Sequence, residues 1–189
     1  MTPLEALDAA AAAYEARLVA VRPDQWGLAT PCEKWTVKDL ADHVLGGNRF
    51  SLPLLAGGSA AQALGIARDG DFTGDPVESY RQSVAAQRAA FAAPGALEVR
   101  VAHPIGTVSG KRFAGMRTFD LLVHAWDLAR ATGGDEELPA DLVAAVLALM
   151  EPVADSMPGS GAFGQGRSGT LTADATAQER LLDLSGRRP

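Results

Sequence analysis

MRTFDLLVHAWDLARATG, residues 116–133, is the stretch from which the fold and the site of this chain can be inferred. It has the composition of an apolar helix, yet Asp120, His124 and Asp127 stand four and three residues apart within it. On an α-helix this spacing places the three side chains on one narrow strip of surface. Apolar residues flank the strip on both sides, so we expect it to face the interior or a cleft.

A carboxylate on a buried strip needs a partner, because an unpaired ionised group in the interior is costly. A divalent metal is one such partner, and Asp120 and His124 are spaced to bind one ion together. A hydrogen-bonded network of the carboxylates and the imidazole is the alternative. For Asp127 we expect a supporting role, either orienting a ligand histidine or pairing with Arg130 or Arg117.

A site of two histidines and one carboxylate needs a second histidine, and besides His124 the chain has only His43 and His103. Thr36 is a good N-cap for a helix that contains His43, and metal sites in helical bundles are built from facing helices. We therefore predict His43 as the third ligand. Asp39, four residues before His43, could support that ligand or simply complete the helix cap.

Further residues could also have a role near the site. His103, in a predicted hairpin, is a candidate for substrate contact or proton transfer. Arg117 could hold a carboxylate group of the substrate, as could Arg81, Arg88 or Arg112. Cys32 precedes the His43 helix, where a thiolate would be favoured, but no histidine is local to it in the sequence, so we interpret it as structural. As the single cysteine it also excludes an internal disulfide and fits a reducing cytoplasm.

The bulk composition predicts an ordinary soluble domain. Hydrophobic residues make up 47% of the 189 residues and charged residues 21%. A net charge of −6 without a local Lys/Arg cluster argues against nucleic acid and anionic membranes as partners. We expect no membrane span or signal sequence and a single domain over 1–189. A monomer and a homodimer are both compatible with the sequence.

Apolar periodicity and turn residues predict the elements. Helices are expected at 2–21, 37–56, 76–91, 116–133, 138–154 and 178–184. A hairpin or extended connection is expected at 96–115, a loop at 63–75, and a Gly-rich loop, with at most one strand, between 157 and 177. These elements make a mainly all-α antiparallel helical bundle the economical architecture.

Two motifs, TPCEKWTVKDLADHV and RTFDLLVHAWDLARATG, together resemble the DinB-like bundles, in the branch that contains the N-terminal domain of mycothiol-dependent maleylpyruvate isomerase. The tail FGQGRSGTLTADATAQERLLDLSGRRP resembles that of short single-domain members, so the resemblance covers essentially the whole chain. It implies a DinB-like antiparallel four-helix bundle that holds one divalent metal. With the elements predicted above, the fold is this bundle with a small β-hairpin insertion and a short C-terminal helix. Carried over by position, the ligands are His43, Asp120 and His124.

The resemblance also implies a function: a metal-dependent transferase in which the ion activates the thiol of mycothiol to attack a small electrophile. Zinc is the first choice of metal, and nickel, iron and manganese also suit these ligands. Relatives often carry glutamate where this chain has Asp120. The isomerase has a further C-terminal domain, for which we expect no counterpart here. A metal-dependent hydrolase, a non-catalytic metal-binding or small-molecule-binding bundle, and a purely structural domain stay open as alternatives.

Overall fold

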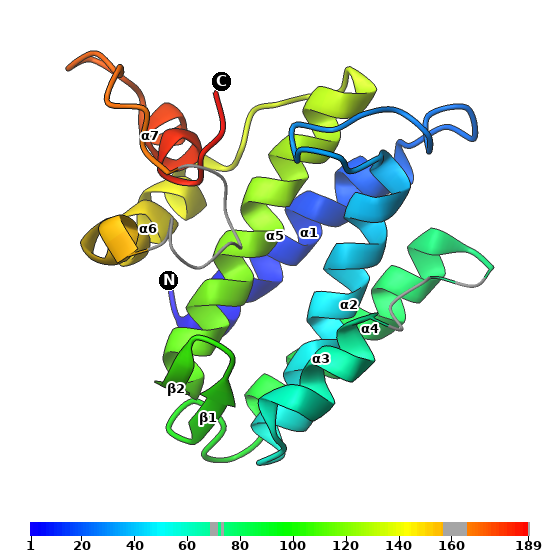
Figure 1. The fold of residues 1–189 in the computed structure, drawn as a ribbon, viewed down its shortest axis with the longest axis vertical. Helices are drawn as coiled ribbons and strands as arrows, with labels where there is room; N and C mark the ends of the chain where they lie inside the picture. The colour runs from blue at the N-terminus through cyan, green and yellow to red at the C-terminus, as the bar shows by residue number, and fades with distance from the viewer. Residues whose placement is uncertain (69–71, 73, 157–165, 189) are drawn as a thin grey trace.

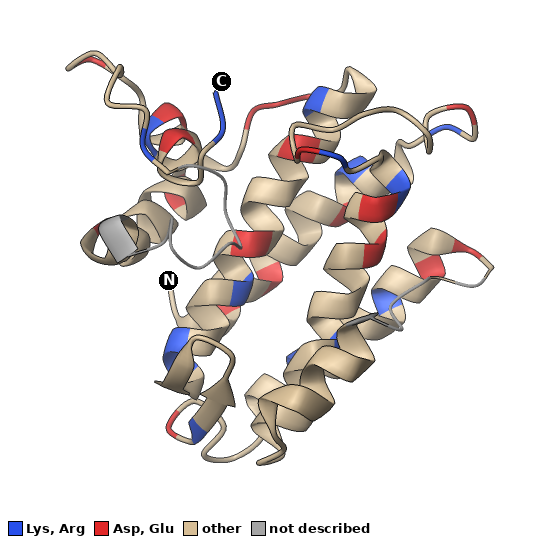
Figure 2. Ribbon diagram, viewed as in Figure 1, with Lys and Arg blue, Asp and Glu red and all other residues tan. Residues whose placement is uncertain are grey.

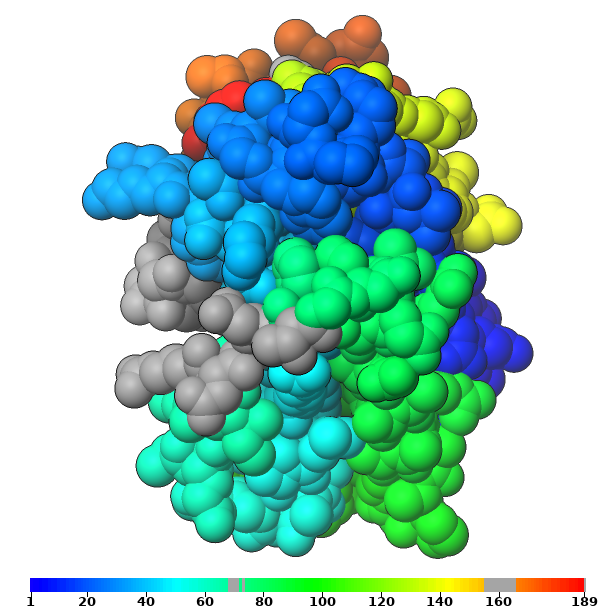
Figure 3. Space-filling view, turned by 90° about the vertical axis from the view of Figure 1, so that its right-hand side faces the viewer, coloured from blue at the N-terminus to red at the C-terminus, as the bar shows by residue number. Residues whose placement is uncertain are grey.

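Four long helices form the body of the molecule in the computed structural model, which describes residues 1–68, 72, 74–156 and 166–188 (Figure 1). They are α1 (Pro3–Val19), α2 (Val37–Leu55), α4 (Pro76–Ala92) and α5 (Gly110–Thr132). The helix α5 contacts α1 and α2, and α4 contacts α1 and α2. The space-filling view shows α4, in green, beside the end of α2, in cyan (Figure 3).

The smaller elements lie around this bundle. They are α3 (Ala60–Arg68), the strands β1 (Arg100–His103) and β2 (Gly106–Ser109), α6 (Ala140–Met150), the 3-10 helix η1 (Glu151–Ser156) and α7 (Ala177–Leu184). The two strands pair antiparallel, with Arg100 opposite Ser109 and His103 opposite Gly106. The helix α6 connects α7 to the bundle, because it contacts both α7 and α5. The predicted helical bundle with a hairpin and a short C-terminal helix is thus confirmed.

Capping residues set the ends of the two helices that matter most for the site. At the start of α2, Thr36 and Asp39 form a capping box, in which each side chain bonds the backbone N–H of the other. At the start of α5, Ser109 Oγ accepts from the N–H of Arg112. The helix α5 ends at Gly133, whose φ of 70° is left-handed and therefore favours glycine.

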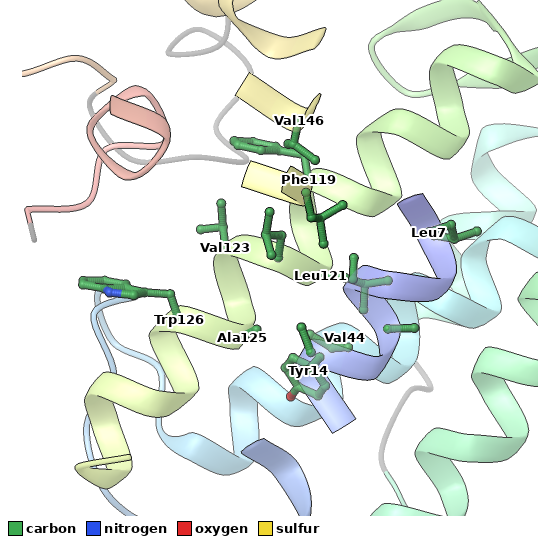
Figure 4. Close-up of a cluster of buried hydrophobic side chains, with 14 of the residues drawn as sticks. Leu7, Tyr14, Val44, Phe119, Leu121, Val123, Ala125, Trp126 and Val146 are labelled. Atoms are coloured by element: carbon green, nitrogen blue, oxygen red, sulfur yellow. The ribbon is translucent and has the colours of Figure 1, made fainter. Parts of the chain in front are cut away.

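The hydrophobic core lies between α5 and its neighbours α1, α2 and α6 (Figure 4). Its largest fully buried side chains include Trp126, Tyr14, Phe113 and Phe119. Nearly the whole circumference of α5 is buried, which explains why its sequence is apolar around the polar strip.

Among the described residues, no helix combines the length and the apolar character that crossing a bilayer requires. Acidic and basic positions are interspersed along the ribbon (Figure 2).

Two helices differ from the prediction. Residues 63–68, predicted as loop, belong to α3, because Ser59 and Gln62 form a reciprocal cap and the alanines that follow favour helix in spite of Gly65. The helix α5 begins at Gly110, six residues before the predicted start. A side chain at Gly110 would collide with the backbone carbonyl of Ala96, so this close approach requires glycine.

The C-terminal third also differs in detail. The predicted helix 138–154 divides into α6 and the 3-10 helix η1, since Pro152 has no N–H to donate to the last turn. The described part of the tail, residues 166–188, contains no strand and ends with α7 close to the predicted helix 178–184. Residues 157–165 of the predicted Gly-rich loop lie outside the described residues.

Candidate metal centre

His43, Asp120 and His124 meet between α2 and α5. Asp120 Oδ1 lies 3.4 Å from Nε2 of His43 and 3.4 Å from Nε2 of His124. One ligand atom from each residue lies within 4.8 Å of the other two. The two histidine side chains differ in exposure, with 38% of His43 and 3% of His124 accessible. The cluster is therefore closed on the α5 side and open at His43.

The second oxygen of Asp120 is held by Arg117. Arg117 Nη1 donates to Asp120 Oδ2 at 2.8 Å, Nε donates to Gln87 Oε1 at 3.1 Å, and Nη2 donates to Asn48 Oδ1 at 3.0 Å. The guanidinium lies close to Gly47 of α2, where any side chain would collide with it. Helices α2, α4 and α5 thus fix Arg117, and Arg117 fixes the direction of the Asp120 carboxylate.

The other ring nitrogen of His124 faces Asp127. His124 Nδ1 lies 2.9 Å from Asp127 Oδ2, and the Asp127 side chain is fully buried. Arg187, which follows α7, donates to both oxygens of this carboxylate, from Nε at 3.1 Å and from Nη2 at 2.7 Å. Burial would raise the pKa of Asp127, but the hydrogen bonds from His124 and Arg187 lower that pKa to about 2.

Cys32 lies at the outer edge of this second cluster. Its Sγ is 3.3 Å from Asp127 Oδ2, 3.9 Å from His124 Nδ1 and 3.1 Å from Arg187 Nη2. The loop that carries Cys32 is closed by a backbone hydrogen bond from Trp35 N–H to the Cys32 carbonyl. Trp35 in turn packs its ring against His43, at a centroid distance of 4.7 Å. The loop between α1 and α2 thus contacts both histidines and leaves His43 partly accessible.

The charges of the centre support one another. Burial alone would raise the pKa of Asp120, but the charges of Arg117 and His124 hold it well below its usual value. Burial alone would lower the pKa of His124, but Asp120 and Asp127 hold it well above its usual value. Burial lowers the pKa of His43, against the opposing charge of Asp120. The two carboxylates beside His124 thus favour positive charge on this ring, which a cation at Nε2 would also supply.

The donor set fits a divalent cation. Two imidazole nitrogens and one carboxylate oxygen converge from two facing helices. The other carboxylate oxygen, Asp120 Oδ2, bonds Arg117, and the other ring nitrogen of His124 bonds Asp127. Sites of this composition bind zinc, iron or nickel and leave positions open for water or substrate. The group formed by Cys32, His124 and Asp127 also has ligand-like spacing, but there Arg187 already supplies the positive charge.

The remaining predicted site residues lie as follows. The Asp39 carboxylate completes the cap of α2, the second of its two predicted roles. His103 lies at the end of β1, half-buried between the rings of Phe50 and Phe113. It belongs to neither of the ligand-like groups found among the described residues. Arg117 is buried and bonded through all its nitrogen atoms within the molecule.

The basic partner of Asp127 differs from both predicted arginines. Neither Arg130 nor Arg117 pairs with it, because Arg130 bonds Glu136 and Arg117 bonds Asp120. The partner is Arg187, 60 residues away along the chain. No local spacing could have indicated this pair. Asn48 and Gln87 were missed for the same reason, since they meet Arg117 only when α2, α4 and α5 pack together.

Comparisons with known proteins agree with this architecture. Two crystal structures of mycothiol-dependent maleylpyruvate isomerase, one of them of a histidine-to-alanine mutant, share the fold with a TM-score of 0.65 and 20% sequence identity. Each match covers 86% of this chain and 72% of the isomerase chain. "Uncharacterized protein Rv0738" of Mycobacterium tuberculosis strain ATCC 25618 / H37Rv is 40% identical over 156 residues, which is 80% of this chain and 81% of that protein.

The family profile matches more specifically. Residues 7–129 match the mycothiol maleylpyruvate isomerase N-terminal domain. The match spans well over half of the chain and contains His43, Asp120, His124 and Asp127. The chain belongs to the mycothiol maleylpyruvate isomerase N-terminal domain family.

Proposed function

We propose that this protein is a metal-dependent enzyme that uses a small thiol of the mycothiol type to transform a small electrophilic substrate. The observation that carries this proposal is the convergence of Asp120 Oδ1 with Nε2 of both His43 and His124. We take residues 1–189 as one DinB-like metal-binding domain and zinc as the first candidate for its ion. A reducing cytoplasm suits an enzyme that uses a thiol.

Each residue of the centre has a definite part in this proposal. His43, Asp120 and His124 would hold the ion. Arg117 bonds Asp120 Oδ2 and so keeps Oδ1 turned toward the two histidines. Asp127 bonds His124 Nδ1 and so keeps Nε2 turned toward the ion. A bound divalent ion would supply Lewis-acid chemistry, favouring the deprotonated form of a thiol that reaches it. The thiol and the electrophile reach the centre at its open edge, beside His43 and Trp35.

Family membership supports the thiol part of the proposal. The isomerases that share this fold are described as mycothiol-dependent and act on maleylpyruvate. Mycothiol is therefore the thiol to test first, and maleylpyruvate the first electrophile. Because the fold likeness is at 20% identity, the assay should extend to other small electrophiles. In this proposal Arg117 orients Asp120, supported by its hydrogen bond to Oδ2, and is not assigned to substrate. Asp39 caps α2.

Elemental analysis of the purified chain tests the proposal. We expect about one divalent metal ion per parent chain and none in His43→Ala or His124→Ala, with the helical circular dichroism spectrum retained. His103→Ala is the matched control and should keep its metal, since His103 packs against the rings of Phe50 and Phe113 and lies in neither ligand-like group of the described residues. A parent chain that holds no metal after reconstitution would contradict the proposal.

Activity assays separate the thiol enzyme from the alternatives. Metal-loaded protein with mycothiol and an electrophile should turn over, and omission of the thiol should abolish the reaction. Hydrolysis without a thiol would assign the protein to the metal-dependent hydrolases. Metal binding without any turnover would assign it to the non-catalytic bundles.

A further inference from the structure

Arg187 reaches the centre from the far end of the chain through a defined turn. The helix α7 ends in a Schellman motif, in which Arg187 N–H bonds the Leu182 carbonyl and Gly186 N–H bonds the Asp183 carbonyl. Gly186 has a φ of 81°, in the left-handed region that favours glycine. This turn directs the chain end, which carries basic residues (blue in Figure 2), back toward α5.

The Arg187 side chain is buried in the interior. Only 7% of it is accessible, and its guanidinium donates to both oxygens of Asp127. The remaining contacts are to the Ser185 carbonyl at 2.9 Å and to Cys32 Sγ at 3.1 Å. A bidentate arginine–carboxylate pair fixes the plane of the carboxylate as well as its position. Asp127 therefore cannot rotate away from His124 while Arg187 is in place.

We propose that Arg187 is a positioning residue for the metal centre, acting on His124 through Asp127. The inference rests on the proposed function, because it needs a metal at His124 Nε2. Asp127 accepts a hydrogen bond from Nδ1–H of His124, which leaves Nε2 free to bind the ion, and Arg187 holds Asp127 in this position. Arg187 lies outside the matched family region 7–129, so the C-terminal segment completes a centre whose proposed ligands all lie within that region.

The affinity for zinc, measured by competition with a chromophoric chelator, tests this inference. Arg187→Ala should bind zinc roughly 10- to 100-fold more weakly than the parent, the usual cost of losing a residue that orients a metal ligand. Arg187→Lys keeps the charge but not the two-pronged geometry, so its affinity should fall between the two. Arg188→Ala is the matched control: the neighbouring arginine is half exposed, bonds Asp183, and should leave the affinity unchanged.

A double variant separates positioning from general destabilisation. If Arg187 acts through Asp127, then Asp127→Asn with Arg187→Ala should bind zinc no more weakly than Asp127→Asn alone. The ¹⁵N shifts of the His124 ring, recorded on zinc-loaded protein, should change in Arg187→Ala and Arg187→Lys but not in Arg188→Ala. Should Arg187→Ala not fold, the lysine variant and the ring shifts still decide the question.

The outcomes distinguish the two proposals. A parent chain that binds zinc with an affinity that neither Arg187 variant changes would overturn the positioning role and leave the metal site intact. A parent chain that binds no divalent metal would overturn the proposed function and the role of Arg187 with it.

Discussion

Asp120 and Asp127 lie on the same helix, seven residues apart, and each bonds a buried arginine and faces one nitrogen of His124. Their oxygens are used differently. Asp127 is fully buried, with both oxygens bonded by Arg187 and one of them also by His124. Asp120 gives one oxygen to Arg117, and the other lies 3.4 Å from two imidazole nitrogens.

The comparison shows why two similar carboxylates have different chemistry available to them. A cation that approached Asp127 would have to displace the guanidinium of Arg187, whereas Asp120 Oδ1 faces two ring nitrogens that can bind the same ion. In each case the arginine neutralises the carboxylate and fixes its direction. The arrangement of the partners, rather than the residue type, therefore separates a ligand from a residue that orients a ligand.

The largest expected effect comes from removing each carboxylate charge in turn. Asp120→Asn should abolish stoichiometric zinc binding, because the amide is a poor replacement for an anionic ligand. Asp127→Asn should retain the site with roughly 10- to 100-fold weaker affinity, since it only orients His124. Chelator competition on both variants checks this order. Equal losses would mean that both carboxylates bind the ion.

The second prediction concerns the arginine beside the proposed ligand. Arg117→Ala should lower the free energy of unfolding of the metal-free protein by about 3–5 kcal/mol, because it leaves Asp120 buried without its guanidinium. Arg81→Ala is the control: Arg81 pairs with Glu15 at the surface, where an exposed ion pair contributes little, so this variant should lose much less stability than Arg117→Ala. Urea unfolding followed by circular dichroism measures both. Similar losses would contradict a buried, essential role for Arg117.

The surroundings of the two carboxylates also show which parts of the site could be predicted from the sequence. Spacing on one helix predicted the strip of Asp120, His124 and Asp127, and capping signals predicted the helix that carries His43. These features depend on residues three or four apart. The partners of the strip depend on packing: Arg187 meets Asp127 only because α7 docks through α6 and Gly186 reverses the chain.

The contacts of Cys32 likewise could not be predicted from its neighbours in the sequence. In the sequence it has no histidine nearby, yet the fold places its sulfur 3.9 Å from a nitrogen of His124, 92 residues later. The missed helix α3 is a different case, because its capping pair, Ser59 and Gln62, is local and could have been recognised. Local signals were thus sufficient for the helices, whereas the contacts around the site required the three-dimensional structure.

The third prediction tests how tightly Arg117 is enclosed. Gly47→Ala should destabilise the protein by about 1–3 kcal/mol, because the new methyl group would collide with a guanidinium that three hydrogen bonds hold in place. Gly65→Ala in α3 is the matched helical control, with no atom within 4 Å of the new methyl group, and should stabilise by about 0.5–1 kcal/mol. Thermal unfolding of both variants gives the signs. A neutral Gly47→Ala would mean that Arg117 has room to move.

The smallest effect concerns His103, which has no carboxylate partner among the residues that the structure describes. Burial between aromatic rings, together with the charge of Arg117, lowers the pKa of His103 from 6.5 to about 4, whereas the carboxylates around His124 raise its pKa. Between pH 6.5 and about 4, the unfolded chain therefore binds a proton at His103 and the folded protein does not. Its contribution to stability is complete above pH 6.5 and is lost as the pH falls toward 4.

NMR titration of the ring protons of His103 should accordingly give a midpoint near 4. The difference in unfolding free energy between the parent and His103→Gln should shrink over the same acidic range, because only the parent loses this contribution. A midpoint near the ordinary value would mean that the hairpin leaves His103 open to water. In that case the contrast with His124 would rest on the carboxylates alone, and burial between Phe50 and Phe113 would have no part in it.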